Sequence, residues 1–265
     1  MPTKYLHRDG LAIHYEHTGT SSLPDTPPPL DRGRFLLFLH GVGGNGRLWS
    51  RQLQHFATAH SPLALDLPGH GRSGGLDGPA SVGEAASTVA GFLDGIGAPP
   101  ALVVGHGLGG QIALALALDH PSRVRSVAVV GTCAGPIGAE EERRILRDVV
   151  RGRRPQSFDA PLFSGEPDFA VVREAWGEIV KTDPRVRLQD LEAWASSDLR
   201  PHLTGLSLPV AVLHGADDRY CDPALGEALA GALPNARFES IAGAGHLAQL
   251  ECPDRINAIL EEICS

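Results

Sequence analysis

Residues 101–118 read ALVVGHGLGGQIALALAL. The first four residues form an apolar run typical of a strand, and the last nine are rich in Ala and Leu, which favour a helix. Glycine at positions 105, 107 and 109 separates the two parts and allows a sharp turn between them. We therefore expect a strand, a tight turn and a helix in immediate succession, a unit typical of a parallel sheet covered by helices.

The same alternation of strand and helix continues on both sides of this unit. Strand-type runs are expected at residues 5–6, 12–16, 35–39, 63–65, 127–130, 210–213 and 237–241, the first two joined as a hairpin around Asp9 and Gly10. Helices are expected at residues 48–58 and 253–263, and from the capping-box sequence at Ser81 to near Gly97. This alternation predicts an α/β fold built on a parallel sheet.

The segment 136–204 breaks this rhythm, because it contains helical patterns and no strand-type run. The helical patterns lie at residues 140–151, 169–181 and 188–195. We interpret this segment as a helical cap over the carboxyl edge of the sheet, where ligands bind in such folds. Residues 1–135 and 205–265 would then form one α/β core domain.

The composition argues against nucleic-acid-binding, membrane and disulfide-rich proteins. A formal net charge of −8 argues against nucleic acid or an anionic membrane as the main partner. No apolar signal region opens the chain, no run is long enough to cross a bilayer, and the four cysteines are too few for a disulfide framework. These features predict a soluble, cytoplasmic protein. The scarcity of lysine among the 23 basic residues indicates a bacterial source.

Five short motifs each lie at the end of an expected strand. They are HGVGG at 40–44, DLPGHGRS at 66–73, GHGLG at 105–109, HGADD at 214–218 and GAGH at 243–246. In this order and spacing they resemble the α/β-hydrolase-fold family, in its group of esterases, lactonases and C–C hydrolases. The resemblance covers nearly all of the chain outside the cap, and it implies a mostly parallel eight-stranded sheet covered by helices, with an inserted helical cap.

The resemblance also implies catalytic roles. His246 is the expected general base and then general acid, and Asp218 is the expected carboxylate that orients it. Asp217 is the second candidate for this carboxylate and Asp222 the third. The main-chain N–H groups of Val42 and Leu108 would form the oxyanion hole.

Gly107 departs from the family's pattern. The family's G-x-S-x-G turn carries a nucleophilic serine at this position, whereas glycine has no atom that could attack a substrate. The turn holds this residue at positive φ, which costs most residues about 1–3 kcal/mol but costs glycine nothing. We therefore expect the fold to tolerate Gly107, and the space left by the missing side chain to admit a water between His246 and the oxyanion hole.

Several residues beside these motifs are candidates for contact with a substrate: His40, Gly41, Trp49, His106, Trp176, Trp194 and Leu247. Core packing is the alternative role for the tryptophans, and packing or loop hydrogen bonding for the histidines. No histidine has a partner at the spacing of a metal site, so neither a metal nor a cofactor is expected. The helical cap predicts an enclosed, largely apolar pocket for a small molecule.

A dinucleotide site is the alternative assignment for one motif. Residues 41–46 read GVGGNG, which matches G-x-G-x-x-G after a strand, and Asp66 follows about 20 residues later. This assignment leaves Asp218 and His246 without a role. We therefore favour the hydrolase.

Three functions remain open. The first is a hydrolase of small carboxylic esters or lactones in which Gly107 replaces the nucleophilic serine, so that this form is inactive or strongly impaired. The second is an enzyme that never used a serine, in which His246 and Asp218 activate water or carry acid/base chemistry. The third is a non-catalytic protein that binds a small molecule. Esters and lactones are favoured over C–C hydrolase substrates, because no cap arginine is identified that would match a dienoate carboxylate.

Overall fold

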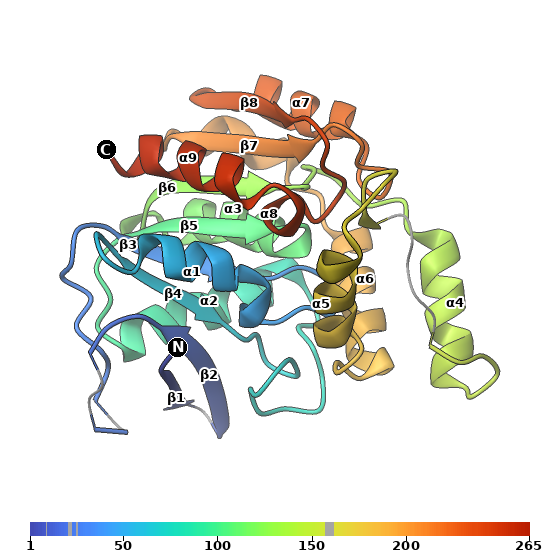
Figure 1. Ribbon diagram of the computed structural model, residues 1–265, viewed down its shortest axis with the longest axis horizontal. Coiled ribbons are helices and arrows are strands. Elements are labelled where there is room, and N and C mark those ends of the chain that lie inside the picture. Colours follow the sequence, from blue (N-terminus) through green and yellow to red (C-terminus); the bar gives the residue numbers. More distant parts are fainter. Residues whose placement is uncertain (9, 21–22, 25, 157–161) are drawn as a thin grey trace.

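The sheet is the centre of the architecture. The computed structural model describes residues 1–8, 10–20, 23–24, 26–156 and 162–265, and over these residues eight strands form one sheet in the order β1-β2-β4-β3-β5-β6-β7-β8 (Figure 1). The strands are β1 (Thr3–Arg8), β2 (Leu11–His17), β3 (Phe35–Leu39), β4 (Ser61–Leu65), β5 (Ala101–His106), β6 (Val124–Val130), β7 (Val210–Gly215) and β8 (Ala236–Ile241). Only β2 pairs antiparallel with its neighbours, β1 and β4. The prediction of a mostly parallel eight-stranded sheet is confirmed.

Helices cover both faces of this sheet. They are α1 (Ser50–Phe56), α2 (Val82–Gly95), α3 (Leu108–Asp119), α7 (Pro223–Ala232), α8 (Ala248–Glu251) and α9 (Pro253–Cys264). Alternate residues of a strand point to opposite faces. Leu36 and Phe38 of β3 therefore pack in one core cluster with α1 and α9, whereas Leu37 and Leu39 pack in another with α2 and α3. All of β3 is buried, as expected of a strand covered on both sides.

The helix that the capping-box sequence predicts begins where expected. The Ser81 hydroxyl accepts the N–H of Glu84 at 3.1 Å and so satisfies one free donor of the first turn of α2. The Glu84 carboxylate accepts the N–H of Ala80, one residue before the position that a reciprocal capping box would use. The helix ends at Gly95, near the expected end at Gly97.

Among the described residues between β6 and β7, three α-helices lie beyond the carboxyl ends of the strands (Figure 1), and a short 3-10 helix, η4 (Arg200–Gly205), follows them. The α-helices are α4 (Glu140–Val150), α5 (Phe169–Ile179) and α6 (Pro184–Ser196), and residues 157–161 of this segment lie outside the described residues. The helix α6 begins before the expected residue 188, because Asp183 caps it through the N–H of Arg185 and Pro184 occupies its first turn.

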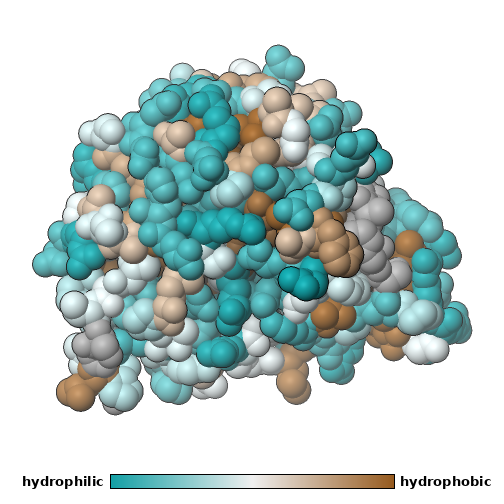
Figure 2. Space-filling view, in the orientation of Figure 1, coloured by the Kyte–Doolittle hydropathy of each residue, from teal (hydrophilic) through white to brown (hydrophobic). Residues whose placement is uncertain are grey.

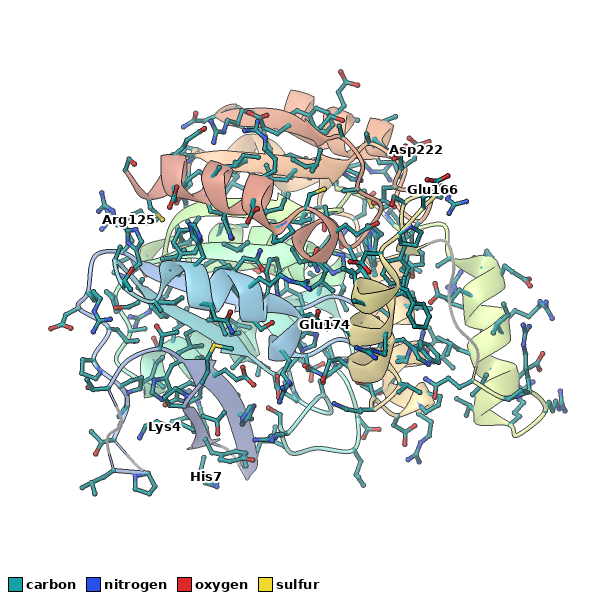
Figure 3. All side chains as sticks on the ribbon, viewed as in Figure 1. Lys4, His7, Arg125, Glu166, Glu174 and Asp222 are labelled. Atoms are coloured by element: carbon teal, nitrogen blue, oxygen red, sulfur yellow. The ribbon has the colours of Figure 1, made fainter. Side chains whose placement is uncertain are left out.

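The segment between β6 and β7, which we expect to act as a cap and call the cap below, packs on the rest of the chain. Side chains of α5 join an apolar cluster with residues of the core, and its members are Leu48, Phe163, Val171, Ala175, Ile179, Leu247 and Leu250. Glu174, labelled in Figure 3, lies on the side of α5 toward α1, and its carboxylate pairs with the Arg51 guanidinium at 2.7 Å. The cap therefore rests against the end of the sheet at which the sequence motifs gather.

Two other features bear on the predictions. Gly10 of the first hairpin has a φ of 79°, as a tight turn requires, while Asp9 lies outside the described residues. Hydrophilic residues predominate on the face shown in Figure 2, with apolar residues scattered among them. Across the described parts of the chain, no helix combines the length and the apolar character needed to cross a membrane.

Candidate active site

Gly107 forms the turn between β5 and α3. Its φ of 52° and ψ of −118° belong to a region that residues with a side chain rarely adopt. The strand and the helix also approach each other closely around it, because a Cβ atom at Gly105 would collide with the carbonyl oxygen of Gly109. The N–H of Leu108 is the first of α3, so no carbonyl within the helix can accept it.

His246 and Asp218 lie together at the same edge of the sheet. The Nδ1 atom of His246 is 2.9 Å from Oδ2 of Asp218, and both side chains are buried. The other carboxylate oxygen accepts the N–H groups of Tyr220 and Cys221 at 2.8 and 2.9 Å. Burial alone would raise the pKa of Asp218, but His246 and the N–H of Cys221 outweigh it and leave the pKa below its ordinary value. The carboxylate is therefore held in its charged form beside the imidazole.

The two alternative carboxylates lie elsewhere. Asp217 is exposed, and its N–H donates to the carbonyl of Ala244. Asp222, labelled in Figure 3, caps α7 by accepting the N–H of Ala224 at 2.9 Å. Of the three candidates, Asp218 is the one that contacts the imidazole of His246.

The imidazole of His246 faces Gly107. A Cβ atom built on Gly107 would lie 3.3 Å from Nε2 of His246 and 3.4 Å from two ring carbons of Trp194. Trp194 belongs to α6, is fully buried and stacks on the imidazole at a centroid distance of 6.3 Å. The place of the missing side chain is therefore bordered by the indole of the cap rather than left as a wide opening.

A small cavity lies beside His246. Its volume is about 20 Å³, and Gly41, Val42, His106 and Leu247 line it together with His246. A cavity of roughly 10–15 Å³ or more holds one water. This water-sized space lies beside His246 and Val42, but neither Gly107 nor Leu108 lines it. It is therefore not the space expected at the side-chain position of Gly107, which His246 and Trp194 border closely.

Three of the seven candidates for substrate contact, Gly41, His106 and Leu247, line this cavity, and Trp194 covers Gly107. The other three do not line it. The buried His40 uses both ring nitrogens on the main chain, at the carbonyl of Gly41 and the N–H of Leu67. Trp49 is buried against Phe38 in the core, and Trp176 lies half-buried on α5. Core packing, the alternative role, therefore describes Trp49, and loop hydrogen bonding describes His40.

Sequence reasoning missed six residues that line the cavity: Leu48, Glu142, Leu162, Ile179, Arg187 and Tyr220. Arg187 is a cap arginine that the sequence analysis did not identify: it lies on α6, lines the cavity, is 3% exposed and pairs with Glu142 at 3.9 Å. The spacing of Arg187 in the sequence gave a partial indication that it is buried. The positions 187, 190, 191 and 194 follow one face of a helix, and all four are buried.

The hydrogen bonds of Asp66 argue against the dinucleotide site. The Asp66 carboxylate is buried and accepts the N–H groups of Gly46 and Arg72 and the ring N–H of His14, at 2.7 to 2.9 Å. These bonds tie the loop after β4 to the turn after β3, so the carboxylate is not available to a ribose. Within the described ranges, no group of three or more His, Cys, Asp or Glu side chains is arranged to hold a metal ion.

Comparison with known proteins agrees with this geometry. Residues 36–259 match the family described as "Alpha/beta hydrolase family". A protein of Azorhizobium caulinodans named "Putative carbamate hydrolase RutD" is 30% identical, over 98% of this chain and 97% of its own length. The enol-lactonase from Burkholderia xenovorans LB400 superposes with a TM-score of 0.78 at 25% identity, over 97% of this chain and 98% of that one. A thermophilic esterase from Thermogutta terrifontis superposes with a TM-score of 0.82 at 26% identity, over 98% and 95%.

The family match and the identity to a relative of the same length rest on sequence, whereas the superpositions rest on the fold. Both lead to proteins that are named hydrolases, lactonases or esterases. This chain belongs to the alpha/beta hydrolase family.

Proposed function

We propose that this chain is a hydrolase of small carboxylic esters or lactones in which Gly107 stands in place of the nucleophile, so that this form is inactive or strongly impaired. One observation carries the proposal. The Cβ position of Gly107 is 3.3 Å from Nε2 of His246, whose other nitrogen is bonded to Asp218. A hydroxyl oxygen one bond beyond that Cβ would come within hydrogen-bond distance of Nε2.

The arrangement around a restored hydroxyl would support acyl transfer. His246 would take the hydroxyl proton as the oxygen attacks the carbonyl carbon, and Asp218 would stabilise the imidazolium that forms. The N–H groups of Val42 and Leu108 would stabilise the negative charge on the carbonyl oxygen. His246 would then give its proton to the departing alkoxide, and a water would hydrolyse the acyl-enzyme by the reverse proton path. With Gly107 the first covalent step has no attacking atom.

The surroundings support a small substrate. Leu48, Leu162, Ile179 and Leu247 contribute apolar surface to the cavity, and the pair of Arg187 and Glu142 contributes charge. An enol-lactonase and an esterase are among the similar structures. A small ester or lactone matches this lining. Because Arg187 lines the cavity, the lack of a cap arginine no longer argues against a substrate that carries a carboxylate.

A second candidate is supported by the water-sized cavity beside His246. In an enzyme without a serine, His246 would remove a proton from a water in this cavity, and the water would attack the carbonyl carbon directly. The indole of Trp194 against Gly107 is compatible with such a site, because it leaves the cavity beside His246 intact.

Restoring the nucleophile separates these functions. Gly107→Ser should hydrolyse p-nitrophenyl acetate on the order of 10³-fold faster or more than the wild-type chain, with a burst of p-nitrophenol equal to the enzyme concentration. Gly107→Ala is the matched control, because it adds the same Cβ atom without the hydroxyl, and it should stay at the wild-type rate. Dihydrocoumarin, assayed in parallel, reports on lactones.

The other outcomes are equally informative. A wild-type activity that His246→Ala abolishes and Gly107→Ser leaves unchanged would favour the enzyme without a serine. The absence of hydrolysis in all variants, with a folded protein, would contradict both enzymatic functions and leave the small-molecule binder.

A further inference from the structure

Three side chains of the cap contact Gly43. It belongs to the segment 40–45, here called the oxyanion loop, which also contains Val42. The N–H of Gly43 donates to Oδ2 of Asp190 at 2.8 Å, and its carbonyl accepts the hydroxyl of Thr182 at 2.8 Å. The side chain of Arg187 lies across it, since a Cβ atom at Gly43 would be 2.6 Å from Cγ of Arg187. All three contacting residues lie on α6 or directly before it.

The carboxylate of Asp190 is itself held by the core. Nε2 of His70 is 2.8 Å from Oδ2 of Asp190, and Nδ1 of His70 is 3.0 Å from the carbonyl oxygen of Pro68. A carbonyl and a carboxylate are both acceptors, so this geometry favours the protonated ring, which donates from both nitrogens. Both side chains are buried, and a charge-assisted bond in such surroundings fixes geometry strongly. Asp190 therefore joins α6 to two core loops at once.

The bond to Asp190 involves the peptide group directly after the N–H of Val42, the expected oxyanion donor. Asp190 accepts the N–H of the peptide bond between Val42 and Gly43, and Thr182 binds the next peptide along the chain. These two bonds fix the main chain directly after Val42. One turn along α6 from Asp190, Trp194 lies against Gly107 and His246. A single helix face thus contacts both sides of the site.

We propose that Asp190 and Thr182 are positioning residues, which hold the oxyanion loop so that the N–H of Val42 points at the reacting carbonyl oxygen only while α6 is docked on the core. The role of Val42 rests on the proposed function. The fixation of Gly43 by the cap does not rest on it, and the test uses this difference.

The first measurement follows the Gly43 N–H in the full chain with Gly107 in place. Amide hydrogen exchange, read by NMR, should be about tenfold faster or more at Gly43 in Asp190→Ala than in the wild type. Glu192→Ala removes a carboxylate from α6 that pairs with the half-exposed Arg147, and it should leave exchange at Gly43 unchanged. Exchange at the wild-type rate in Asp190→Ala would overturn the proposal.

The second measurement follows catalysis in the Gly107→Ser background. Asp190→Ala should lower kcat for p-nitrophenyl acetate about 10- to 100-fold per active site, as titrated by the burst, with KM within about threefold. A merely structural role would lower the burst amplitude and leave the rate per titrated site unchanged, and that result would overturn the proposal.

Thr182→Val keeps the test decisive if Asp190→Ala does not fold. It preserves the shape of the side chain and removes only the bond to the carbonyl of Gly43, so kcat per site should fall about three- to tenfold. An unchanged kcat in folded Thr182→Val would contradict the proposal. If Gly107→Ser shows no hydrolysis, the proposed function fails, while exchange at Gly43 still decides whether the cap holds the oxyanion loop.

Discussion

Gly107 combines an unusual backbone conformation with close neighbours. Its φ is 52°, and an added Cβ atom would lie 3.3 Å from His246 and 3.4 Å from Trp194. The sequence motif predicted the positive φ, because this turn demands it in any chain of the family. It could not predict the contact with Trp194, because that indole comes from the cap, far along the chain.

Gly107→Ala should therefore destabilise the protein by about 1–3 kcal/mol, since alanine meets the full penalty of positive φ. Urea unfolding followed by circular dichroism measures this change. Gly177→Ala is the control, because Gly177 lies in α5 with open space around its Cβ position and should gain about 0.5–1 kcal/mol from helix propensity. Equal stability of Gly107→Ala and the wild type would contradict the strain at this position.

The choice between the two neighbouring aspartates is a second prediction at the scale of residues. In the Gly107→Ser background, Asp218→Asn should lower kcat on the order of 10⁴-fold, because the amide no longer stabilises the imidazolium of His246. Asp217→Asn should change kcat by less than about twofold, because this exposed side chain is not bonded to the imidazole. Steady-state kinetics with p-nitrophenyl acetate tests both, and the reverse order of effects would reassign the carboxylate.

At the scale of elements, the sequence predicted what local patterns encode. Residues 35–39 form β3 with the bounds that were predicted, because a strand buried on both faces is apolar throughout and easily recognised. The predicted helix began at residue 188, whereas α6 begins at Pro184. Asp183 and Pro184 are typical of a helix N-terminus and could have indicated this start. The contacts of α6 were beyond prediction, because Gly43 and Asp190 are 147 residues apart in the chain and nothing in either local pattern specifies the other.

We expect the pair of His70 and Asp190 to make the docking of α6 depend on pH. Burial alone would lower the pKa of His70, but the charge of Asp190 and their hydrogen bond outweigh it and raise the pKa above 6.5. The other titratable groups near His70 are His40, at a ring distance of 4.7 Å, and Asp66. Burial and the charge of His70 lower the pKa of His40 to about 4, so His40 stays neutral in the relevant range.

Because the folded state binds the His70 proton more tightly than the unfolded chain, this stabilisation is complete below pH 6.5 and is lost as the pH rises through the raised pKa. The wild type should therefore exceed His70→Gln by about 3 kcal/mol in free energy of unfolding at acidic pH, and the difference should shrink at alkaline pH. Urea unfolding from about pH 5 to about pH 9 measures it. His55→Gln, which loses an exposed pair with Glu261, should change stability by less than about 1 kcal/mol. A difference that grows with pH would contradict the account.

At the scale of the whole molecule, the core and the cap meet over the site. The cavity of about 20 Å³ has room for a water but not for an ester, so we expect the cap to move before a substrate binds. The five sequence motifs located most of the core side of the site, whereas the cap side, including Ile179 and Arg187, emerged only from the packing. Each motif directly follows a strand, so its position can be predicted from the local sequence. The contacts between cap and core join segments that are far apart in the chain, and the local sequence does not specify them.

The cap should open more easily than the sheet. Amides of α5 should exchange hydrogen at least about tenfold faster than those of β3 and β5, because α5 docks through a small apolar cluster, whereas both strands are buried throughout. Exchange measured by mass spectrometry on peptides of the full chain tests this. Equal protection of cap and sheet would show that they open only by global unfolding.

The central claim is that a nucleophile at residue 107 would complete a catalytic site that is otherwise assembled. Treating Gly107→Ser with diethyl p-nitrophenyl phosphate and determining the intact mass tests it most directly, because attack by an activated hydroxyl releases p-nitrophenol and leaves one diethylphosphoryl group on the protein. The account predicts one such group per chain, located at residue 107 by peptide mapping, and none in Gly107→Ala or in Gly107→Ser combined with His246→Ala. A folded Gly107→Ser protein that stays unmodified, or one modified equally without His246, would contradict it.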